Sequence, residues 1–265
     1  MNYKFALIGQ NVSLSPSAFI HNRLFELNNT NASYDLISLP TLNSKHYEEI
    51  NSYYDGFNVT APYKQTVLKY IAKKDENLNF NAINTVKKGI GYNTDIYGAN
   101  KALTDFQADM YNEILLIGNG GVAKAFMALF IKNNANVTIA VRNEEKGAAF
   151  IKEFQDANSR MINLNDINKN YDLIVNATTI GQINDTKLID DSVIKKSGKI
   201  FDAVYFSNKT ILEKSADKYK IPYLNGLSML IYQAAYAQQI WINQPLLDDA
   251  VLKQLILDTK NYLRS

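Results

Sequence analysis

The chain has 265 residues, 46% of them hydrophobic and 20% charged, which suits a globular protein of one large domain or two modest ones. Its net charge of +2 gives no strong attraction to nucleic acid or to a membrane surface, and no apolar run approaches the ~20 residues of a membrane span. The lack of cysteine excludes disulfides and thiolate metal sites, and the first residues do not resemble a signal peptide, so we expect a cytoplasmic protein.

The first part of the chain alternates strands and helices. Strands are predicted at residues 4–9, 34–39 and 56–60, and helices at 16–27, at 43–53 and from 61–64 onward. A hairpin is then predicted over 82–86 and 90–93, followed by a helix over 95–106. Alternation of this kind predicts an α/β fold with a mostly parallel sheet.

Several polar residues of this part have both a structural and a functional explanation. Ser15, before Pro16, suits a helix cap, whereas Ser13 lies beyond any cap and could bind a small anion or a polyol. Lys64 falls in the first turn of a predicted helix, where the dipole disfavours a cation, so proton transfer competes with an ordinary surface role. Asp95 opens the next helix, where capping is the structural explanation.

A glycine-rich turn follows the apolar run at residues 114–117 and leads directly into a helical pattern. Gly118, Gly120 and Ala123 fit G-x-G-x-x-G/A, the turn that accommodates a pyrophosphate at a helix N-terminus. A second apolar strand at 137–141 completes a βαβ unit, the context in which this pattern indicates dinucleotide binding. An ordinary strand–helix corner is the structural alternative.

The end of that second strand indicates which dinucleotide is bound. An NAD site carries an acid there to accept hydrogen bonds from the ribose, but this chain has Arg142 followed by Asn143. A guanidinium suits a 2′-phosphate, so NADP is the favoured cofactor. Alternatively, Arg142 is a solvated side chain that pairs with Glu144 or Glu145.

The rest of the chain continues the alternation and then becomes helical. Strands are predicted at 171–176, 199–205 and 222–225, and helices at 209–220, 227–242 and 246–263. Because no strand separates the last two helices, we expect them to return to the first part of the fold. The predicted organisation is a substrate-binding domain at 1–101, an NADP-binding domain at 102–226, and C-terminal helices at 227–265.

Seven short motifs follow one another around the glycine turn. They are Ser13-Leu14-Ser15-Pro16 with His21-Asn22, Asn58-Val59-Thr60 with Pro62 and Lys64, Ala82-Ile83-Asn84-Thr85, Asn93-Thr94-Asp95 with Gly98, Asn176-Ala177-Thr178, Asp202 with Tyr205, and Gly226 with Met229-Leu230 and Gln233-Ala234. In this order they make the sequence resemble the shikimate dehydrogenase family from Ile8 to Trp241.

The resemblance implies an N-terminal substrate-binding domain, a Rossmann-like NADP-binding domain, and NADPH-dependent reduction of 3-dehydroshikimate to shikimate in chorismate biosynthesis. It implies Lys64 and Asp95 as the catalytic residues. It implies substrate contacts from Ser13, Ser15, Thr60, Asn84, Tyr205 and Gln233. It implies cofactor contacts from Gly118, Asn119, Gly120, Gly121, Val122, Arg142, Asn143, Lys146, Thr178, Ala203 and Gly226.

The residue types agree with this chemistry. Hydride transfer to a ketone leaves charge on the oxygen, so a proton must arrive there. The ammonium group of Lys64 can donate it, while Asp95 can hold that ammonium in place and accept a hydrogen bond from the neighbouring hydroxyl. No metal is required, and His21 and His46 are too few for a convincing histidine site.

Two other functions stay open at this point. One is a quinate/shikimate dehydrogenase of broader substrate and cofactor range, because quinate differs by one ring hydroxyl. The other is a non-catalytic nucleotide-sensing module that has kept the fold. In each case we expect small-molecule ligands rather than nucleic acid or membrane, and a monomer or homodimer.

Overall fold

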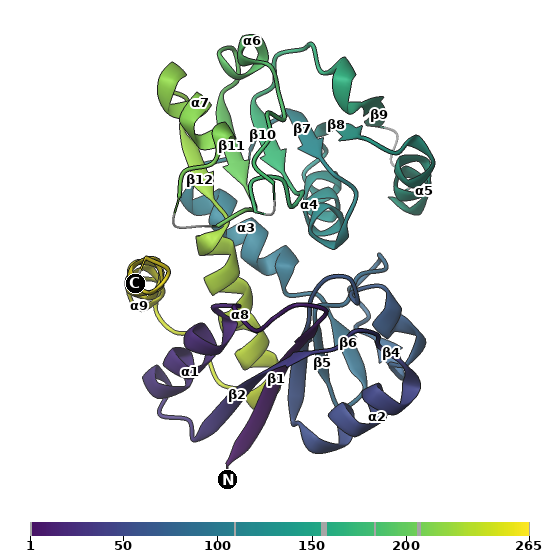
Figure 1. Ribbon diagram of the computed structural model, residues 1–265, viewed down its shortest axis with the longest axis vertical. Coiled ribbons are helices and arrows are strands. Elements are labelled where there is room, and N and C mark those ends of the chain that lie inside the picture. Colours follow the sequence, from purple (N-terminus) through teal and green to yellow (C-terminus); the bar gives the residue numbers. More distant parts are fainter. Residues whose placement is uncertain (1, 109, 155–157, 183, 206–207, 265) are drawn as a thin grey trace. The chain divides into compact units, whose positions relative to one another are not determined.

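The computed structural model describes residues 2–108, 110–154, 158–182, 184–205 and 208–264. The chain divides into two compact units, one of Met1–Gly98 with Leu230–Ser265 and one of Ala99–Met229. It passes from the first unit to the second within helix α3 (Asp95–Asp105) and returns within helix α8 (Leu227–Ile242). Both ends of the chain therefore belong to the first unit (Figure 1).

The first unit is built on a six-stranded sheet with the order β2-β1-β3-β5-β6-β4 (Figure 1). The strands are β1 (Tyr3–Gly9), β2 (Ala32–Ser38), β3 (Gly56–Val59), β4 (Lys73–Lys74), β5 (Thr85–Lys87) and β6 (Ile90–Tyr92). β1 pairs in parallel with β2 and β3, whereas β5 is antiparallel to both β3 and β6. Besides its parts of α3 and α8, the unit contains α1 (Ser17–Leu27), α2 (Ser44–Tyr53), the 3-10 helix η1 (Thr66–Lys69) and α9 (Asp249–Tyr262).

Trp241, near the end of α8, attaches the C-terminal helices to this first sheet. Its ring stacks on Phe5 of β1 with centroids 4.6 Å apart, and its Nε1 donates to the carbonyl of Val86 at 3.0 Å. A Cβ on Gly56 would lie 2.4 Å from Trp241 Cδ1, so only glycine lets the indole lie this close to β3. The predicted substrate-binding domain at 1–101 and NADP-binding domain at 102–226 stay predictions, because packing alone does not show what each part binds.

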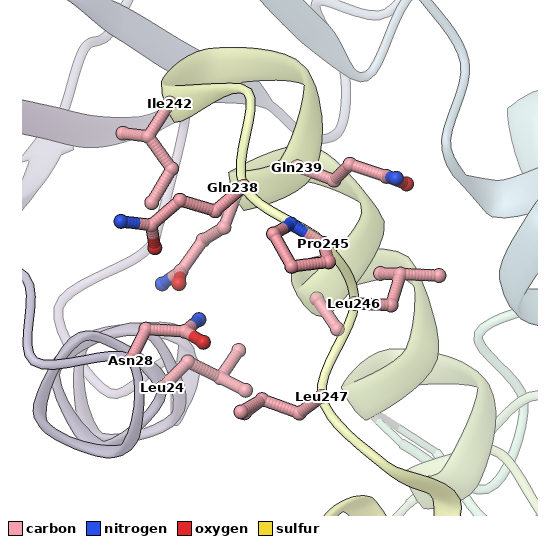
Figure 2. A pocket seen from close by; sticks show the side chains of 10 residues that line it. Leu24, Asn28, Gln238, Gln239, Ile242, Pro245, Leu246 and Leu247 are labelled. Atoms are coloured by element: carbon pink, nitrogen blue, oxygen red, sulfur yellow. The ribbon is translucent and has the colours of Figure 1, made fainter.

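A small hollow of about 10 Å³ lies between α1 and the segment that joins α8 to α9 (Figure 2). Leu24, Gln238 and Pro245 are among the side chains that line it. A volume of this size accommodates one water molecule at most. It is therefore a packing feature of the first unit and not a candidate substrate site.

The second unit contains a parallel sheet with the order β12-β11-β10-β7-β8-β9 (Figure 1). Its strands are β7 (Glu113–Ile117), β8 (Asn136–Val141), β9 (Ser159–Asn163), β10 (Leu173–Asn176), β11 (Lys199–Asp202) and β12 (Tyr223–Asn225). Its helices are α4 (Gly121–Lys132), α5 (Glu144–Phe154), the 3-10 helix η2 (Leu164–Asp166), α6 (Asp191–Ile194) and α7 (Ile211–Tyr219). The inner strands β7, β10 and β11 are apolar because helices cover both faces of such a sheet.

Residues 61–65 form turns, so the helix predicted from 61–64 onward is wrong. The carbonyl of Lys64 accepts a hydrogen bond from the amide of Ile83 at 2.8 Å instead of from a residue one helical turn ahead. Nearby, the hydroxyl of Tyr63 donates to the carbonyl of Leu39 at 2.6 Å. These tertiary hydrogen bonds override the local helical pattern and leave only the short η1.

Two short strands were not predicted from the sequence. β9 is an edge strand whose five residues mix polar and apolar side chains, and β4 has only two residues. Neither is long enough to produce a clear alternation of hydrophobic residues. Within the described residues, no helix is both long enough and apolar enough to cross a membrane.

Candidate functional site

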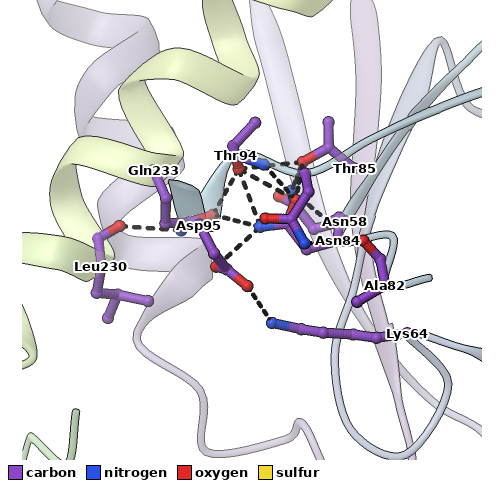
Figure 3. A network of polar contacts seen from close by, with 10 residues as sticks. Asn58, Lys64, Ala82, Asn84, Thr85, Thr94, Asp95, Leu230 and Gln233 are labelled. Carbon is purple, nitrogen blue, oxygen red and sulfur yellow. Dashed lines mark hydrogen bonds and ion pairs between the residues drawn. The ribbon is translucent and has the colours of Figure 1, made fainter. Parts of the chain in front are cut away.

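Lys64 and Asp95 form an ion pair in the first unit (Figure 3). Lys64 lies in the turns after β3 and Asp95 is the first residue of α3, yet Lys64 Nζ lies 2.5 Å from Asp95 Oδ2. The lysine side chain is 15% exposed and the aspartate side chain 8%. The pair is thus largely removed from water while the lysine keeps some access to a ligand.

The second oxygen of Asp95 is also held by a side chain. Asn84 Nδ2 donates to Asp95 Oδ1 at 2.9 Å, and Asn84 Oδ1 accepts from the backbone amide of Thr94 at 2.7 Å. Both carboxylate oxygens therefore accept from side chains, and the carboxylate belongs to a polar cluster at the start of α3.

Gln233 of α8 joins the same cluster (Figure 3). Its Oε1 accepts from Thr94 Oγ1 at 3.1 Å, and its Nε2 donates to the carbonyl of Leu230 at 2.9 Å. The structure therefore brings together four of the residues predicted for catalysis and substrate binding. They are Lys64, Asp95, Asn84 and Gln233.

The predicted substrate residues Ser13 and Thr60 lie in the loops after β1 and β3, at the carboxyl ends of two paired parallel strands. A Cβ on Gly9 would lie 2.5 Å from Thr60 Cγ2, so glycine at the end of β1 lets these loops approach closely. Ser13 is exposed, and its hydroxyl has no hydrogen-bond partner in the described part of the chain. No described contact links either residue to the Lys64–Asp95 pair, so their roles stay predictions.

Ser15 takes part in the start of α1, which begins one residue later than expected. Its Oγ lies 2.9 Å from Ser17 Oγ and accepts from the amide of Ser17 at 3.3 Å. The helix itself begins at Ser17 with Pro16 in the cap position. The prediction that Ser15 is the N-cap is therefore wrong, although its hydroxyl does bond to the first residue of the helix, whereas Ser13 has no structural role in the described structure.

This difference predicts different outcomes for two serine substitutions. Ser13→Ala is expected to raise KM for the substrate at unchanged thermal stability, because nothing in the fold depends on its hydroxyl. Ser15→Ala should raise KM and also lower stability by up to ~1 kcal/mol, through the lost hydrogen bond at the helix start. Steady-state kinetics and thermal unfolding measure the two effects, and a kinetically silent Ser13→Ala would remove Ser13 from the site.

The glycine turn of the second unit has the conformation expected of a phosphate-binding turn. Gly118 has φ +107°, and a Cβ there would lie 3.0 Å from Thr178 Cγ2, so the fold itself requires glycine. Gly120 has φ −82°, and a Cβ there would meet nothing within 4 Å. Glycine at 120 is thus not needed for protein packing, which fits a position kept bare for a bound pyrophosphate.

The other residues of the turn are arranged for the same purpose. Asn119, Gly121 and Val122 are half-buried at the N-terminus of α4, where backbone amides have no helical partner. Ala123 is fully buried, as close packing of helix on strand requires. The turn therefore fits a dinucleotide in backbone conformation, in packing and in its free amides.

Arg142 follows β8 at the carboxyl end of the sheet and is exposed. Its guanidinium has no ion pair or hydrogen bond within the residues that the structure describes, so the alternative pairing with Glu144 or Glu145 is not formed. Asn143 Oδ1 accepts from the amide of Lys146 at 2.8 Å and so caps α5. Arg142 and Lys146 are thus exposed cations beside a capped helix start.

Three further predicted cofactor residues lie in the loops after β10, β11 and β12. Thr178 Oγ1 donates to Asn176 Oδ1 at 2.7 Å, which fixes the loop after β10. A Cβ on Gly226 would lie 2.3 Å from the carbonyl oxygen of Ala203, so these two loops touch through their backbones. Tyr205, predicted to lie near the substrate, is half-buried in the second unit. Ligands of open parallel sheets bind at this carboxyl edge.

A hollow of about 300 Å³ lies at the opposite, amino edge of this sheet. Glu113, Asn136 and Arg160, at the starts of β7, β8 and β9, are among its lining residues. It contains none of the predicted site residues. Because ligands of parallel sheets bind at the carboxyl edge, this hollow is not the candidate site.

Asp202, at the end of β11, is a buried carboxyl group that the sequence reading treated only as part of a motif. Its Oδ1 accepts from Asn176 Nδ2 at 2.9 Å and from the amide of Val204 at 3.1 Å. Its Oδ2 accepts from the hydroxyls of Tyr223 at 2.9 Å and Thr210 at 3.4 Å. Burial raises the pKa of Asp202 from 3.8 to about 6, although these donors oppose the shift.

The raised pKa predicts that Asp202 makes folding depend on pH. Between about pH 4 and 6 the folded carboxyl holds its proton more tightly than the unfolded one, so its contribution to stability falls as pH rises through this window. Asp202→Asn removes this dependence and keeps the hydrogen bonds, since the hydroxyls of Tyr223 and Thr210 can accept from an amide. Relative to the variant, the natural protein should lose up to about 3 kcal/mol between pH 4 and pH 7. Urea unfolding across this range checks the result, and parallel curves for the two proteins would contradict it.

His21 is buried in the first unit and stacks on Tyr34 with ring centroids 4.1 Å apart. Burial lowers the pKa of His21 to about 3, so the imidazole is neutral at ordinary pH. Among the described residues, no three His, Asp or Glu side chains are grouped closely enough to hold a metal ion. His21 is thus a core residue of α1, and its buried Nε2 has no hydrogen-bond partner within the described residues.

Several residues that support the site were not among those predicted for it from the sequence. Asn58, Thr85 and Thr94 connect Asn84 and Asp95 to the sheet, and Asn176 and Asp202 connect the loops of the second unit. All five belong to the motifs quoted above. An Asn, Thr or Asp in an otherwise apolar strand end is the signal that could have identified them, because a buried polar group needs a partner.

Comparison with known proteins gives consistent matches over most of the chain. A family model described as the shikimate dehydrogenase substrate binding domain matches residues 7–86, and one described as shikimate/quinate 5-dehydrogenase matches residues 100–200. A shikimate dehydrogenase (NADP(+)) of Methanococcus maripaludis is 36% identical over 251 residues, which are 89% of this chain and 90% of that protein. One from Saccharolobus solfataricus is 32% identical over 95% of this chain and 93% of its own length.

A solved structure has the same fold throughout. The crystal structure of a chorismate mutase/shikimate 5-dehydrogenase fusion protein from Clostridium acetobutylicum superposes with a TM-score of 0.91. The match covers 100% of both chains at 27% sequence identity. The predicted α/β class, with a substrate-binding and a Rossmann-like domain, is thereby confirmed.

Proposed function

The chain belongs to the shikimate dehydrogenase family, and we propose that it catalyses the reversible, NADP-dependent interconversion of 3-dehydroshikimate and shikimate. The observation that carries this proposal is the sequestered Lys64–Asp95 pair, whose carboxylate is held by Asn84. A nucleotide-sensing module would have no need of such a pair. The enzyme is therefore an oxidoreductase that acts on a CH–OH group.

The glycine turn and the cations beside it support NADP as the cofactor. Gly118 to Val122 would hold the pyrophosphate, and Arg142 with Lys146 would contact the 2′-phosphate. Thr178, Ala203 and Gly226 lie on the same edge of the sheet and would border the rest of the dinucleotide. When bound, NADPH supplies the hydride and leaves as NADP⁺.

The protein's own residues manage the proton. As the substrate carbonyl carbon gains a hydride, its oxygen becomes an alkoxide and needs one proton to become the hydroxyl of shikimate. Lys64 Nζ provides that proton, and Asp95 holds the ammonium in place beforehand. In the reverse direction neutral Lys64 takes the proton from the hydroxyl.

The remaining site residues orient the substrate. Asn84 and Gln233 lie in the cluster around Asp95, and Ser13, Ser15, Thr60 and Tyr205 complete the proposed set. Hydroxyl, amide and phenol groups suit the carboxylate and ring hydroxyls of shikimate. We assign substrate contacts mainly to the first unit and cofactor contacts to the second.

An absorbance assay tests this function directly. Purified protein is mixed with shikimate or quinate and with NADP or NAD, and the reduced-nicotinamide band is followed. We expect shikimate with NADP to give the highest kcat/KM of the four combinations. Failure to reduce either cofactor with shikimate would refute the proposal, and equal rates with quinate would favour the broader dehydrogenase.

The cellular setting is a further part of the proposal. The low net charge and the small-molecule substrate support an enzyme of the cytoplasm, and we further propose that it acts as a monomer or homodimer. Light scattering after size-exclusion chromatography distinguishes these two states from larger assemblies. A tetramer or higher oligomer would contradict this expectation.

A further inference from the structure

A series of buried side-chain hydrogen bonds runs from Tyr34 across the sheet of the first unit to Asp95, and Figure 3 shows it from Asn58 onward. The hydroxyl of Tyr34 on β2 donates to Asn58 Oδ1 on β3 at 2.7 Å, and Asn58 Nδ2 donates to Thr85 Oγ1 on β5 at 2.9 Å. Thr85 Oγ1 donates to Asn84 Oδ1 at 3.0 Å, and Asn84 Nδ2 donates to Asp95 Oδ1 at 2.9 Å. All five side chains are buried.

The donors and acceptors of this series of hydrogen bonds fit an arrangement that points toward Asp95. Asn58 Nδ2 donates one hydrogen to Thr85 and the other to the carbonyl of Asn84, at 3.1 Å. The Thr85 hydroxyl accepts from Asn58, and its single hydrogen has two oxygens in reach, Asn84 Oδ1 at 3.0 Å and Thr94 Oγ1 at 3.2 Å. When it donates to the nearer one, Asn84 Oδ1, every link donates in the direction of Asp95.

This arrangement fixes which way the Asn84 amide faces. Asn84 Oδ1 accepts from Thr85 and from the amide of Thr94, so Nδ2 must face Asp95. A flipped amide would place its oxygen against the carboxylate and leave buried donors unpaired, which is costly away from water. With Oδ1 held by Asn84, Asp95 presents Oδ2 to Lys64.

At the Tyr34 end of this series of hydrogen bonds, the two stacked rings carry no charge that could reverse the direction of donation. The ring of Tyr34 stacks on His21, and burial lowers the pKa of His21 to about 3. Tyr34 is itself buried, and burial raises its pKa. Both rings are neutral at the pH at which a dehydrogenase is assayed, so the phenol keeps its hydrogen for Asn58.

We propose that Thr85 and Asn58 are positioning residues, which orient the Asn84 amide and through it hold Asp95 toward Lys64. Neither residue belongs to the predicted substrate or cofactor contacts. The inference rests on the proposed function, because its effect is measured on the dehydrogenase reaction. According to this proposal, Thr85 and Asn58 affect the rate of the reaction without contacting the substrate or the cofactor.

Thr85→Val tests the proposal, because valine keeps the shape of threonine and removes the hydroxyl. We expect kcat with shikimate to fall about tenfold, the upper range for one neutral hydrogen bond, at unchanged KM for NADP. Thr85→Ser, which restores the hydroxyl, should recover most of the rate. The matched control is Thr259→Val in α9, where a fully buried threonine donates to the carbonyl of Leu255 at 2.8 Å outside this series of hydrogen bonds.

The comparison with Thr259→Val separates positioning from stability. Both variants are expected to lose similar unfolding free energy, but only Thr85→Val should lose kcat. Equal kcat in the two variants would overturn the proposal. If Thr85→Val does not fold, Tyr34→Phe takes its place, because it removes the hydroxyl that donates to Asn58. Its control is Tyr47→Phe, since the buried Tyr47 hydroxyl has no hydrogen-bond partner within the described structure. Equal kcat in these two variants would also overturn the proposal.

The unmodified protein distinguishes failure of this inference from failure of the proposed function. If it does not oxidise shikimate with NADP, the function is wrong. If it does and Thr85→Val keeps the control's kcat, only the positioning role is wrong.

Discussion

Replacing Lys64 by alanine is expected to lower kcat by about 10²–10⁴-fold with a much smaller rise in KM. The proton that we assign to Lys64 would be needed in the transition state, and a general acid typically contributes a factor in this range. Steady-state kinetics with shikimate and NADP measures the effect. Lys74→Ala is a suitable control, because Lys74 is also in the first unit and its ammonium group donates to Phe80 and Asn81, outside the Lys64–Asp95 cluster.

Lys64→Arg separates proton transfer from simple binding. Arginine keeps the positive charge beside Asp95 but does not release a proton near neutral pH, so it should not restore kcat. If Lys64 only binds substrate, Lys64→Ala raises KM at unchanged kcat and Lys64→Arg keeps most activity. That result would end its assignment as proton donor.

Asp95→Asn extends the same prediction to the partner of Lys64. It should also lower kcat, because an amide does not hold the ammonium 2.5 Å away as the carboxylate does. The loss in the double variant Lys64→Ala with Asp95→Asn should be much smaller than the product of the two single losses, as for groups that act as a unit. Multiplicative losses would indicate that the two residues act independently.

The second large effect concerns the choice of cofactor. Arg142→Asp should reduce kcat/KM for NADP by about ten- to a hundredfold, the range for a lost charge-assisted hydrogen bond to a phosphate. An aspartate at the end of β8 can instead accept from the ribose hydroxyls of NAD, so kcat/KM for NAD should fall less or rise. The ratio of the two kcat/KM values is the quantity to compare.

Arg160→Asp is the matched control for this substitution. Arg160 is also an exposed arginine of the second unit, but it lies in β9 at the amino edge of the sheet, where its Nε donates to Thr138 Oγ1. It should leave the cofactor ratio unchanged. Equal kcat/KM for NADP and NAD in the natural protein would contradict the assignment of Arg142.

The sequence by itself determined the family, the fold class and the cofactor. The apolar strands, the glycine turn and the seven ordered motifs are local signals, and matches to shikimate dehydrogenases confirm the family that they indicated. Local signals suffice here because the positive φ of Gly118 requires glycine at that position. Arg142 and Asn143 can likewise be located from the sequence, because they directly follow one apolar strand. Neither signal requires knowledge of distant contacts.

Only the tertiary structure decided how Lys64 and Asp95 are held. The predicted helix at Lys64 is absent because its carbonyl bonds to Ile83, a residue that the local pattern could not take into account. Likewise, the route from Tyr34 through Thr85 to Asp95 joins side chains of three different strands, and the raised pKa of Asp202 depends on burial by its neighbours. Hydrogen-bond partners and dielectric surroundings arise only when distant segments pack together, so the sequence named these residues without showing how they act.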